Sequence, residues 1–256
     1  MKLSFKSRRR VVQSGAVIVL LLPLFFYPTI WFGTYISADF LGVALTDPLT
    51  ALEILAAGRT VWWPLLVSVI PLVLVAALVG RMFCSFVCPL NFLLELLPMK
   101  KEAKARKKWW PIIGIFVAVL LSALVQDPVF TMLSPLHNLM RMFLFGLGIE
   151  FVFVVAVLLG AWLYGRKIWC QAICPLGALY GVTGIGRCIT IGLDEERCTH
   201  CGKCVQTCSM AVRPGSLTLL DKVSCTNCGD CIDVCEEKAL YYAVCGKRKK
   251  RGDEAL

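Results

Sequence analysis

Long apolar runs without charge alternate with polar segments over the first two thirds of the chain. Four such runs cover residues 11–38, 60–80, 109–126 and 142–165. Each is close to the roughly 20 residues that a helix needs to cross about 30 Å of hydrocarbon. The fourth run contains Glu150, so its membrane part is expected to begin there. The pattern predicts four membrane-spanning helices.

The first run follows Arg8, Arg9 and Arg10, an arrangement that is also typical of a cleaved signal peptide. It is longer than the apolar core of a signal peptide, has no convincing small-residue cleavage site, and contains Pro23 and Pro28. We therefore expect a retained helix that is kinked at its prolines.

The apolar region contains an internal repeat. The first and third runs are each followed by Asp-Pro, and the second and fourth each end on two cysteines and a proline. The two copies are Asp47-Pro48 with Cys84-x3-Cys88-Pro89, and Asp127-Pro128 with Cys170-x3-Cys174-Pro175. Two repeated helix hairpins predict an all-α, four-helix membrane bundle over residues 1–186, with a pseudo-twofold axis along the membrane normal.

The composition fits this interpretation: 58% of residues are hydrophobic, 17% are charged, and the mean hydropathy is +0.73. These values exclude a purely soluble globule. The net charge of +10 comes from bases before the first run and between the second and third, whereas the other loops hold only Arg59 and Arg141. The positive-inside rule therefore predicts a four-pass protein of the bacterial inner membrane, with both termini cytoplasmic and in contact with membrane lipid. A nucleic-acid partner is not expected, because the remaining soluble domain has no basic face.

The chain contains fourteen cysteines, a large number for its length. Eight of them lie in two consecutive runs with the spacing Cys-x2-Cys-x2-Cys-x3-Cys. This is the pattern of two-cluster bacterial ferredoxins, in which the fourth cysteine of each run ligates the other cluster. Zinc is the weaker alternative, since it prefers two Cys-x2-Cys pairs separated by a longer stretch. The predicted ligands are Cys198, Cys201, Cys204 and Cys235 for the first [4Fe–4S] cluster, and Cys225, Cys228, Cys231 and Cys208 for the second.

A small α+β ferredoxin domain is expected over residues 187–246, with strand-like segments at 189–193, 217–220 and 240–244 and a charged tail at 247–256. Ser209 and Glu236 replace the proline that usually follows each run. The proline ligates nothing, so this difference affects the cluster potential and not cluster binding.

The repeated Cys-x3-Cys-Pro motif offers four more thiolates: Cys84, Cys88, Cys170 and Cys174. Two cysteines four positions apart share one face of a helix, and four thiolates suit a metal ion or an iron–sulfur cluster. A redox-active dithiol and simple packing remain alternatives. The remaining pair, Cys188 and Cys245, is expected to be unligated.

Few ionisable residues lie within the apolar region. His137 and Glu150 are candidates for the hydrogen-bond acceptor and proton outlet of a quinol site, because ionisable groups at membrane depth are costly. Loop solvation and helix capping are the alternative roles. The only other histidine, His200, lies inside the first cysteine run, so a bis-histidine haem is not expected.

Three segments resemble NapH, the ferredoxin-type membrane subunit of the quinol dehydrogenase that serves periplasmic nitrate reductase. They are residues 45–49 (LTDPL), 83–91 (FCSFVCPLN) and 169–181 (WCQAICPLGALYG). Related membrane ferredoxins serve nitrous oxide reduction and methylamine oxidation. The resemblance implies quinol oxidation and electron transfer to a partner ferredoxin-type iron–sulfur subunit, and then to a periplasmic reductase or a cytochrome c.

Together these features predict an electron-transfer subunit of an oxidoreductase and not a stand-alone enzyme. A quinol gives up two electrons, and two one-electron clusters suit that donor. The alternatives are a maturation factor that handles a metal through the Cys-x3-Cys-Pro motifs, and a docking subunit for a periplasmic metalloenzyme.

Overall fold

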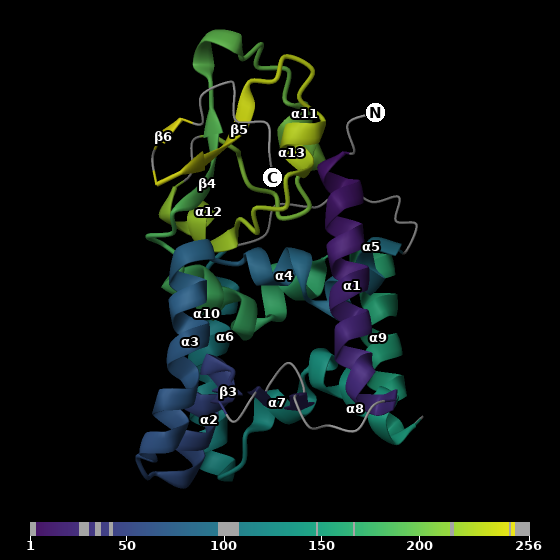
Figure 1. The fold of residues 1–256 in the computed structure, drawn as a ribbon, viewed down its shortest axis with the longest axis vertical. Coiled ribbons are helices and arrows are strands. Elements are labelled where there is room, and N and C mark those ends of the chain that lie inside the picture. Colours follow the sequence, from purple (N-terminus) through teal and green to yellow (C-terminus); the bar gives the residue numbers. More distant parts are fainter. Residues whose placement is uncertain are drawn as a thin grey trace.

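The computed structural model describes residues 4–25, 31–33, 37–40, 43–96, 108–146, 148–165, 167–215, 218–245 and 247–248. A helical region is followed by a ferredoxin-like domain at one end of the molecule (Figure 1). The helices of the first region are α1 (Phe5–Phe25), α2 (Pro48–Gly58), α3 (Trp63–Val79), α4 (Met82–Phe86), α5 (Pro89–Leu96), α6 (Trp110–Val125), α7 (Val129–Leu133), α8 (Pro135–Phe145), α9 (Ile149–Tyr164), the π-helical turn η1 (Trp169–Ile173) and α10 (Pro175–Thr183).

The helices that replace the predicted spans are shorter than expected. Among the described residues, no helix combines the length and the apolar character needed to cross a membrane. Three of them, α3, α6 and α9, have 17, 16 and 16 residues, which corresponds to about 24–26 Å at 1.5 Å per residue. The prediction of a four-helix membrane bundle is therefore wrong, and so is that of a four-pass inner-membrane protein with cytoplasmic termini.

Backbone turns at their C-terminal ends explain why these helices stop early. Gly80 and Gly165, with φ of 70° and 114°, follow α3 and α9, and Gln126 with φ of 63° follows α6. A positive φ is incompatible with a continuing right-handed helix. An apolar run can therefore be longer than the helix that it contains.

The first run also changes structure part-way. α1 ends at Phe25 and does not continue to residue 38, and its first turns contain Lys6, Arg8, Arg9 and Arg10. The chain then forms an antiparallel sheet of β1 (Trp31–Gly33), β2 (Ser37–Phe40) and β3 (Val43–Thr46), with Trp31 opposite Phe40 and Ser37 opposite Thr46. Aromatic and β-branched residues in this segment favour strands.

The two Asp-Pro sequences behave differently. Asp47 caps α2, because its carboxylate accepts hydrogen bonds from the backbone N–H groups of Leu49 and Thr50. α7 begins after Pro128. The N–H of Val129 donates to Ser122 Oγ, and those of Phe130 and Thr131 donate to the buried Glu53 of α2. Side chains of other helices therefore cap α7, and not the aspartate that precedes its proline.

Two groups of helices stand side by side in Figure 1. α2, α3, α6 and α10 pack together, whereas α8 packs on α9 and α5, and α1 runs along α4 and α5. The core between α5, α8 and α9 contains Leu90, Leu94, Leu139, Val154 and Ala161. In this view the ferredoxin-like domain lies above both groups of helices.

The ferredoxin-like domain is built on the antiparallel pair β4 (Ile189–Leu193) and β5 (Leu240–Val244), which confirms two of the expected strands. The third expected strand, 217–220, is wrong. A capping box of Thr218 and Asp221 starts a helix there, α12 (Leu219–Ser224). The remaining elements are η2 (Glu195–Arg197), α11 (Lys203–Thr207), α13 (Asp230–Asp233) and β6 (Lys247–Arg248).

Candidate iron–sulfur centres

The two four-cysteine runs have the same backbone conformation. His200 and Asn227 lie just before the second cysteine of their runs, with φ of 53° and 50°. Gly202 and Gly229 lie just after it, with φ of 74° and 83°. The repeated Cys-Gly therefore supplies the residue type that turns the chain at the same point of each loop.

The fold brings cysteines of the two runs together in a crossed arrangement. Cys208 of the first run lines the same cavity as Cys225, Cys228 and Cys231 of the second. Cys204 interacts electrostatically with Cys201 of its own run and with Cys235 of the other. This placement supports the proposed ligand sets, with the fourth ligand exchanged between runs.

Backbone N–H groups point at cysteine sulfurs in both loops. The N–H of Val212 donates to Cys208 Sγ at 3.5 Å, and the N–H of Ala239 donates to Cys235 Sγ at 3.3 Å. Both donors lie four residues after the cysteine. Hydrogen bonds of this kind tune the potential of a thiolate-bound cluster.

The first Cys-x3-Cys-Pro motif begins on the expected α-helix, α4, whereas the second begins on the π-helical turn η1, and both motifs end on one wide hydrogen bond. The N–H of Cys88 donates to the carbonyl of Phe83 at 3.2 Å, and that of Cys174 to the carbonyl of Trp169 at 2.9 Å. Both bonds reach back five residues, which is the spacing of a π-turn. Such wide turns are frequent at functional sites.

The four thiols of these motifs lie close to one another. Cys84, Cys88 and Cys174 line one cavity of about 40 Å³, and Cys170 packs with Cys88 against the same apolar core. Within the described part of the chain, no three Cys, His, Asp or Glu side chains surround a point as ligands of one metal ion would. An iron–sulfur cluster needs a different arrangement, because each thiolate binds a different iron.

Buried cations test whether thiolate-bound clusters fit these sites. Arg81 is 3% exposed and Arg187 is 5% exposed, and among the described residues neither forms an ion pair with a carboxylate. Arg81 interacts electrostatically with Cys84 and Cys170, and Arg187 with Cys225. The Nε atoms of both arginines have no hydrogen-bond partner. Thiolate-bound clusters would supply the missing negative charge, so the residues fit.

Neutral thiols would not balance these cations. Burial, followed by repulsion from neighbouring thiolates, raises the pKa of Cys174 to about 12, and burial raises the pKa of Cys170 to about 11. Without a metal these thiols are therefore protonated at neutral pH. A bound metal displaces the protons and gives Arg81 its anionic partner.

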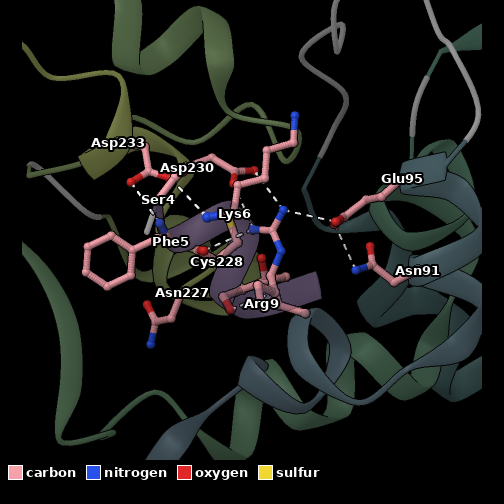
Figure 2. Close-up of polar contacts among 12 residues, drawn as sticks. Ser4, Phe5, Lys6, Arg9, Asn91, Glu95, Asn227, Cys228, Asp230 and Asp233 are labelled. Atoms are coloured by element: carbon pink, nitrogen blue, oxygen red, sulfur yellow. Dashed lines mark hydrogen bonds and ion pairs between the residues drawn. The ribbon is translucent and has the colours of Figure 1, made fainter. Parts of the chain in front are cut away.

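A network of buried charges lies beside the second cluster loop (Figure 2). Arg9 of α1 pairs with Glu95 at 3.0 Å and with Asp230 at 2.8 Å, and it also donates to the carbonyl of Cys228 at 2.9 Å. Lys167 pairs with the second oxygen of Glu95 at 3.0 Å. Arg9 is the middle one of three consecutive arginines, and nothing in its local sequence separates it from Arg8 or Arg10.

Hydrogen bonds join each Cys-x3-Cys-Pro motif to a backbone carbonyl beside a ligand proposed for the second cluster, one in each cysteine run. Ser85, which follows Cys84, donates to the carbonyl of Thr226 at 3.0 Å. Gln171 occupies the matching position of the second motif and donates to the carbonyl of Ser209. Both acceptors adjoin ligands proposed for the second cluster. The two motifs therefore meet that cluster through equivalent side chains.

The quinol-site candidates belong to α8 and α9, and Leu136, the neighbour of His137, lines the cavity that contains Cys84, Cys88 and Cys174. Glu150 forms an ion pair with Arg141 at 3.3 Å, and the buried Nδ1 of His137 has no hydrogen-bond partner. Their role at a quinol site stays a prediction. Cys188 and Cys245, at the ends of β4 and β5, are joined to each other in a disulfide.

Comparison with known proteins places these motifs in a family. A protein-family profile described as "4Fe-4S binding domain" matches residues 61–112 and 147–187. These segments hold both Cys-x3-Cys-Pro motifs. The ferredoxin-type protein NapH of Escherichia coli is 32% identical over 70% of this chain and 67% of its own length. The chain belongs to the family of NapH and MauN ferredoxin-type proteins.

The family is also represented by the methylamine utilization ferredoxin-type protein MauN of Methylorubrum extorquens, 32% identical over 69% of this chain. This chain spans 65% of the length of that MauN protein. The putative electron transport protein YccM of Escherichia coli is 30% identical over 53% of the chain. No solved structure matches. The chain is therefore a ferredoxin-type protein of the NapH and MauN family, with a match to a 4Fe-4S binding domain.

The crossed arrangement predicts which cluster depends on Cys208. Cys208→Ser should remove the cluster held by Cys225, Cys228 and Cys231, because Cys208 is the proposed fourth ligand of that site. The first cluster should stay intact. Electron paramagnetic resonance of the reduced protein measures both clusters. Cys245→Ser should leave both signals unchanged. Loss of the first cluster alone would show that each run binds its own cluster.

Proposed function

We propose that the chain holds three thiolate-bound iron–sulfur centres in a row and passes electrons through them, from a quinol to a partner iron–sulfur protein. The first and second centres are the [4Fe–4S] clusters of the ferredoxin-like domain. The third uses Cys84, Cys88, Cys170 and Cys174. The downstream partner is a ferredoxin-type subunit that supplies a terminal reductase.

The observation that carries this proposal is a pair of hydrogen bonds from the Cys-x3-Cys-Pro motifs to carbonyls beside Cys225 and Cys208, two ligands proposed for the second cluster. Ser85 and Gln171 each lie between the two cysteines of a Cys-x3-Cys-Pro motif, and each donates to a carbonyl beside a ligand of the second cluster. The four thiols of the two Cys-x3-Cys-Pro motifs would therefore lie next to the second cluster. The family profile described as "4Fe-4S binding domain" covers the same motifs.

The different exposure of the two cysteine runs supports a direction of electron flow. Cys201 of the first run is exposed, whereas Cys231 of the second is buried. A partner can reach the first cluster from solvent, while the second lies between it and the third centre. Donor electrons would then enter at the helical region and leave through the exposed loop.

Anaerobic titration with decyl-ubiquinol tests this function directly. The clusters of the purified protein should be reduced by the quinol, with absorbance loss near 400 nm followed by oxidation when a ferredoxin acceptor is added. A maturation or docking factor would be reduced by dithionite and not by quinol. That result would overturn the electron-transfer proposal.

The buried cations predict different potentials for the two ferredoxin clusters. Arg187 donates to the carbonyl of Cys225 at 3.1 Å, and Arg9 donates to that of Cys228. Arg187→Gln keeps a donor but removes the charge, and should lower the potential of the second cluster by an amount on the order of tens of millivolts, because a nearby cation stabilises the more negative, reduced cluster. Redox titration followed by paramagnetic resonance measures the shift.

The matched control is Arg59→Gln. Arg59 ends α2, and that helix lies toward the end of the molecule opposite the ferredoxin-like domain (Figure 1). It should leave both potentials unchanged. Equal shifts in the two clusters for Arg187→Gln would contradict the assignment of this arginine to the second site.

A further inference from the structure

An apolar cavity lies beside the third thiol site. It has a volume of about 320 Å³ and is formed by α3, α4 and one residue of α10. Substrate cavities start at about 300 Å³, so this one can take a single substituted aromatic ring. Its walls include Leu72, Val75 and Val79 of α3, Met82 and Phe83 of α4, and Tyr180 of α10.

One polar pair adjoins this apolar surface. The hydroxyl of Tyr180 donates to Oδ1 of Asp47 at 2.7 Å, and both residues are buried, at 4% and 3% exposure. The other oxygen of Asp47 caps α2. Burial raises the pKa of Asp47 to about 6. The carboxylate is therefore ionised at neutral pH and is a stronger base than an exposed aspartate.

The same aromatic residues separate this cavity from the thiols. Phe83 and Tyr180 line both the apolar cavity and the cavity that contains Cys84, Cys88 and Cys174. Their ring centroids are 5.7 Å apart. A ring bound in the apolar cavity would be one aromatic side chain away from the third centre, which is a short path for electron transfer.

We propose that this cavity is the quinol site, with the ring against Phe83 and one quinol hydroxyl hydrogen-bonded to Tyr180. The inference rests on the proposed function, because it names where that function's donor binds. It differs from the sequence prediction, which placed the quinol near His137 and Glu150.

Oxidation of a quinol to a quinone breaks two O–H bonds and releases two electrons and two protons. The oxidants are the protein's iron–sulfur centres, which take one electron each. Tyr180 passes its hydroxyl proton to Asp47 and receives one from the quinol hydroxyl. The second proton leaves through the open side of the cavity to solvent.

Two positioning variants test the proton path without removing the cavity. Asp47→Asn keeps the cap of α2, because asparagine caps a helix as well as aspartate. Tyr180→Phe keeps the ring that forms the wall. Each should slow cluster reduction at saturating decyl-ubiquinol by at least tenfold, while reduction by dithionite and the iron content stay unchanged. Unchanged quinol rates in both variants would overturn the proposed roles.

Occupancy of the cavity is tested separately by a light-activated azido-quinone. The label should attach within residues 72–87, and Val75→Trp, which fills the cavity, should abolish that label and raise the KM for decyl-ubiquinol at least tenfold. Leu74→Trp is the matched control, since Leu74 is equally exposed but does not line the cavity. Both KM and labelling should be unchanged in that control.

The outcomes separate this site from the proposed function. Quinol reduction of the unaltered protein with labelling around residues 135–150 would overturn this site and restore His137 and Glu150, while the electron-transfer function stands. Absence of both labelling and quinol reduction, with normal dithionite reduction, would overturn the quinol as donor and this site with it.

Discussion

Glu95→Ala should reduce the free energy of unfolding by about 3–5 kcal/mol, the typical effect of removing one partner of a buried ion pair. Glu95 accepts from Arg9 through one oxygen and from Lys167 through the other. The side chains of the three residues are 5%, 1% and 3% exposed. Without the carboxylate, Asp230 is the remaining ion-pair partner described for Arg9, and Lys167 loses its ion pair with Glu95. The midpoint of guanidinium unfolding, compared at equal iron content, measures the loss.

The control is Glu236→Gln, which breaks the exposed pair between Lys203 and Glu236. Surface pairs of this kind contribute little, so the unfolding midpoint should not move. The unfolding midpoint of Glu95→Gln should lie between those of Glu95→Ala and Glu236→Gln, since the amide oxygen can still accept a hydrogen bond from one of the two cations. Equal midpoints for Glu95→Ala and Glu236→Gln would show that the buried network does not stabilise the fold.

The second large effect concerns iron. The unaltered protein should contain about twelve iron atoms, four for each of three [4Fe–4S] clusters. The double variant Cys84→Ser, Cys170→Ser should contain about eight, because it removes one ligand from each Cys-x3-Cys-Pro motif. Arg81 would also lose its anionic partner. Colorimetric iron analysis and Mössbauer spectroscopy measure the difference.

A second double variant, Cys188→Ser with Cys245→Ser, is the matched control for loss of two cysteines. It removes the disulfide between β4 and β5 and should leave the iron content unchanged. If the unaltered protein held only about eight iron atoms and its four Cys-x3-Cys-Pro thiols reacted freely with iodoacetamide, the third centre would be excluded.

Local patterns in the sequence were sufficient where a feature depends on spacing. The two cysteine runs fix their own loop geometry, since a glycine follows the second cysteine in each and adopts a positive φ there. The strands at 189–193 and 240–244 and the cap of α2 by Asp47 are local for the same reason. The family followed from the motifs and is confirmed by the comparison with NapH.

Features that depend on tertiary contacts were not predictable. Glu53 lies in the middle of α2, and only the packing of α7 above it shows that this carboxylate caps another helix. Arg9 differs from Arg8 and Arg10 only because α1 turns it toward Glu95 and Asp230. The apolar runs indicated helices but not where they end, and those end points decide whether a helix is long enough to span a membrane.

The start of α1 has a consequence for the order of folding. Its first N–H groups, those of Phe5 and Lys6, both donate to the carboxylate of Asp233, at 3.0 Å each and across 228 and 227 residues. The ribosome makes this helix 228 residues before its capping partner Asp233. Contacts between residues so far apart in the sequence form slowly, so α1 is expected to dock late in folding. Chaperones and proteases would recognise the nascent chain until the second cluster loop captures that helix.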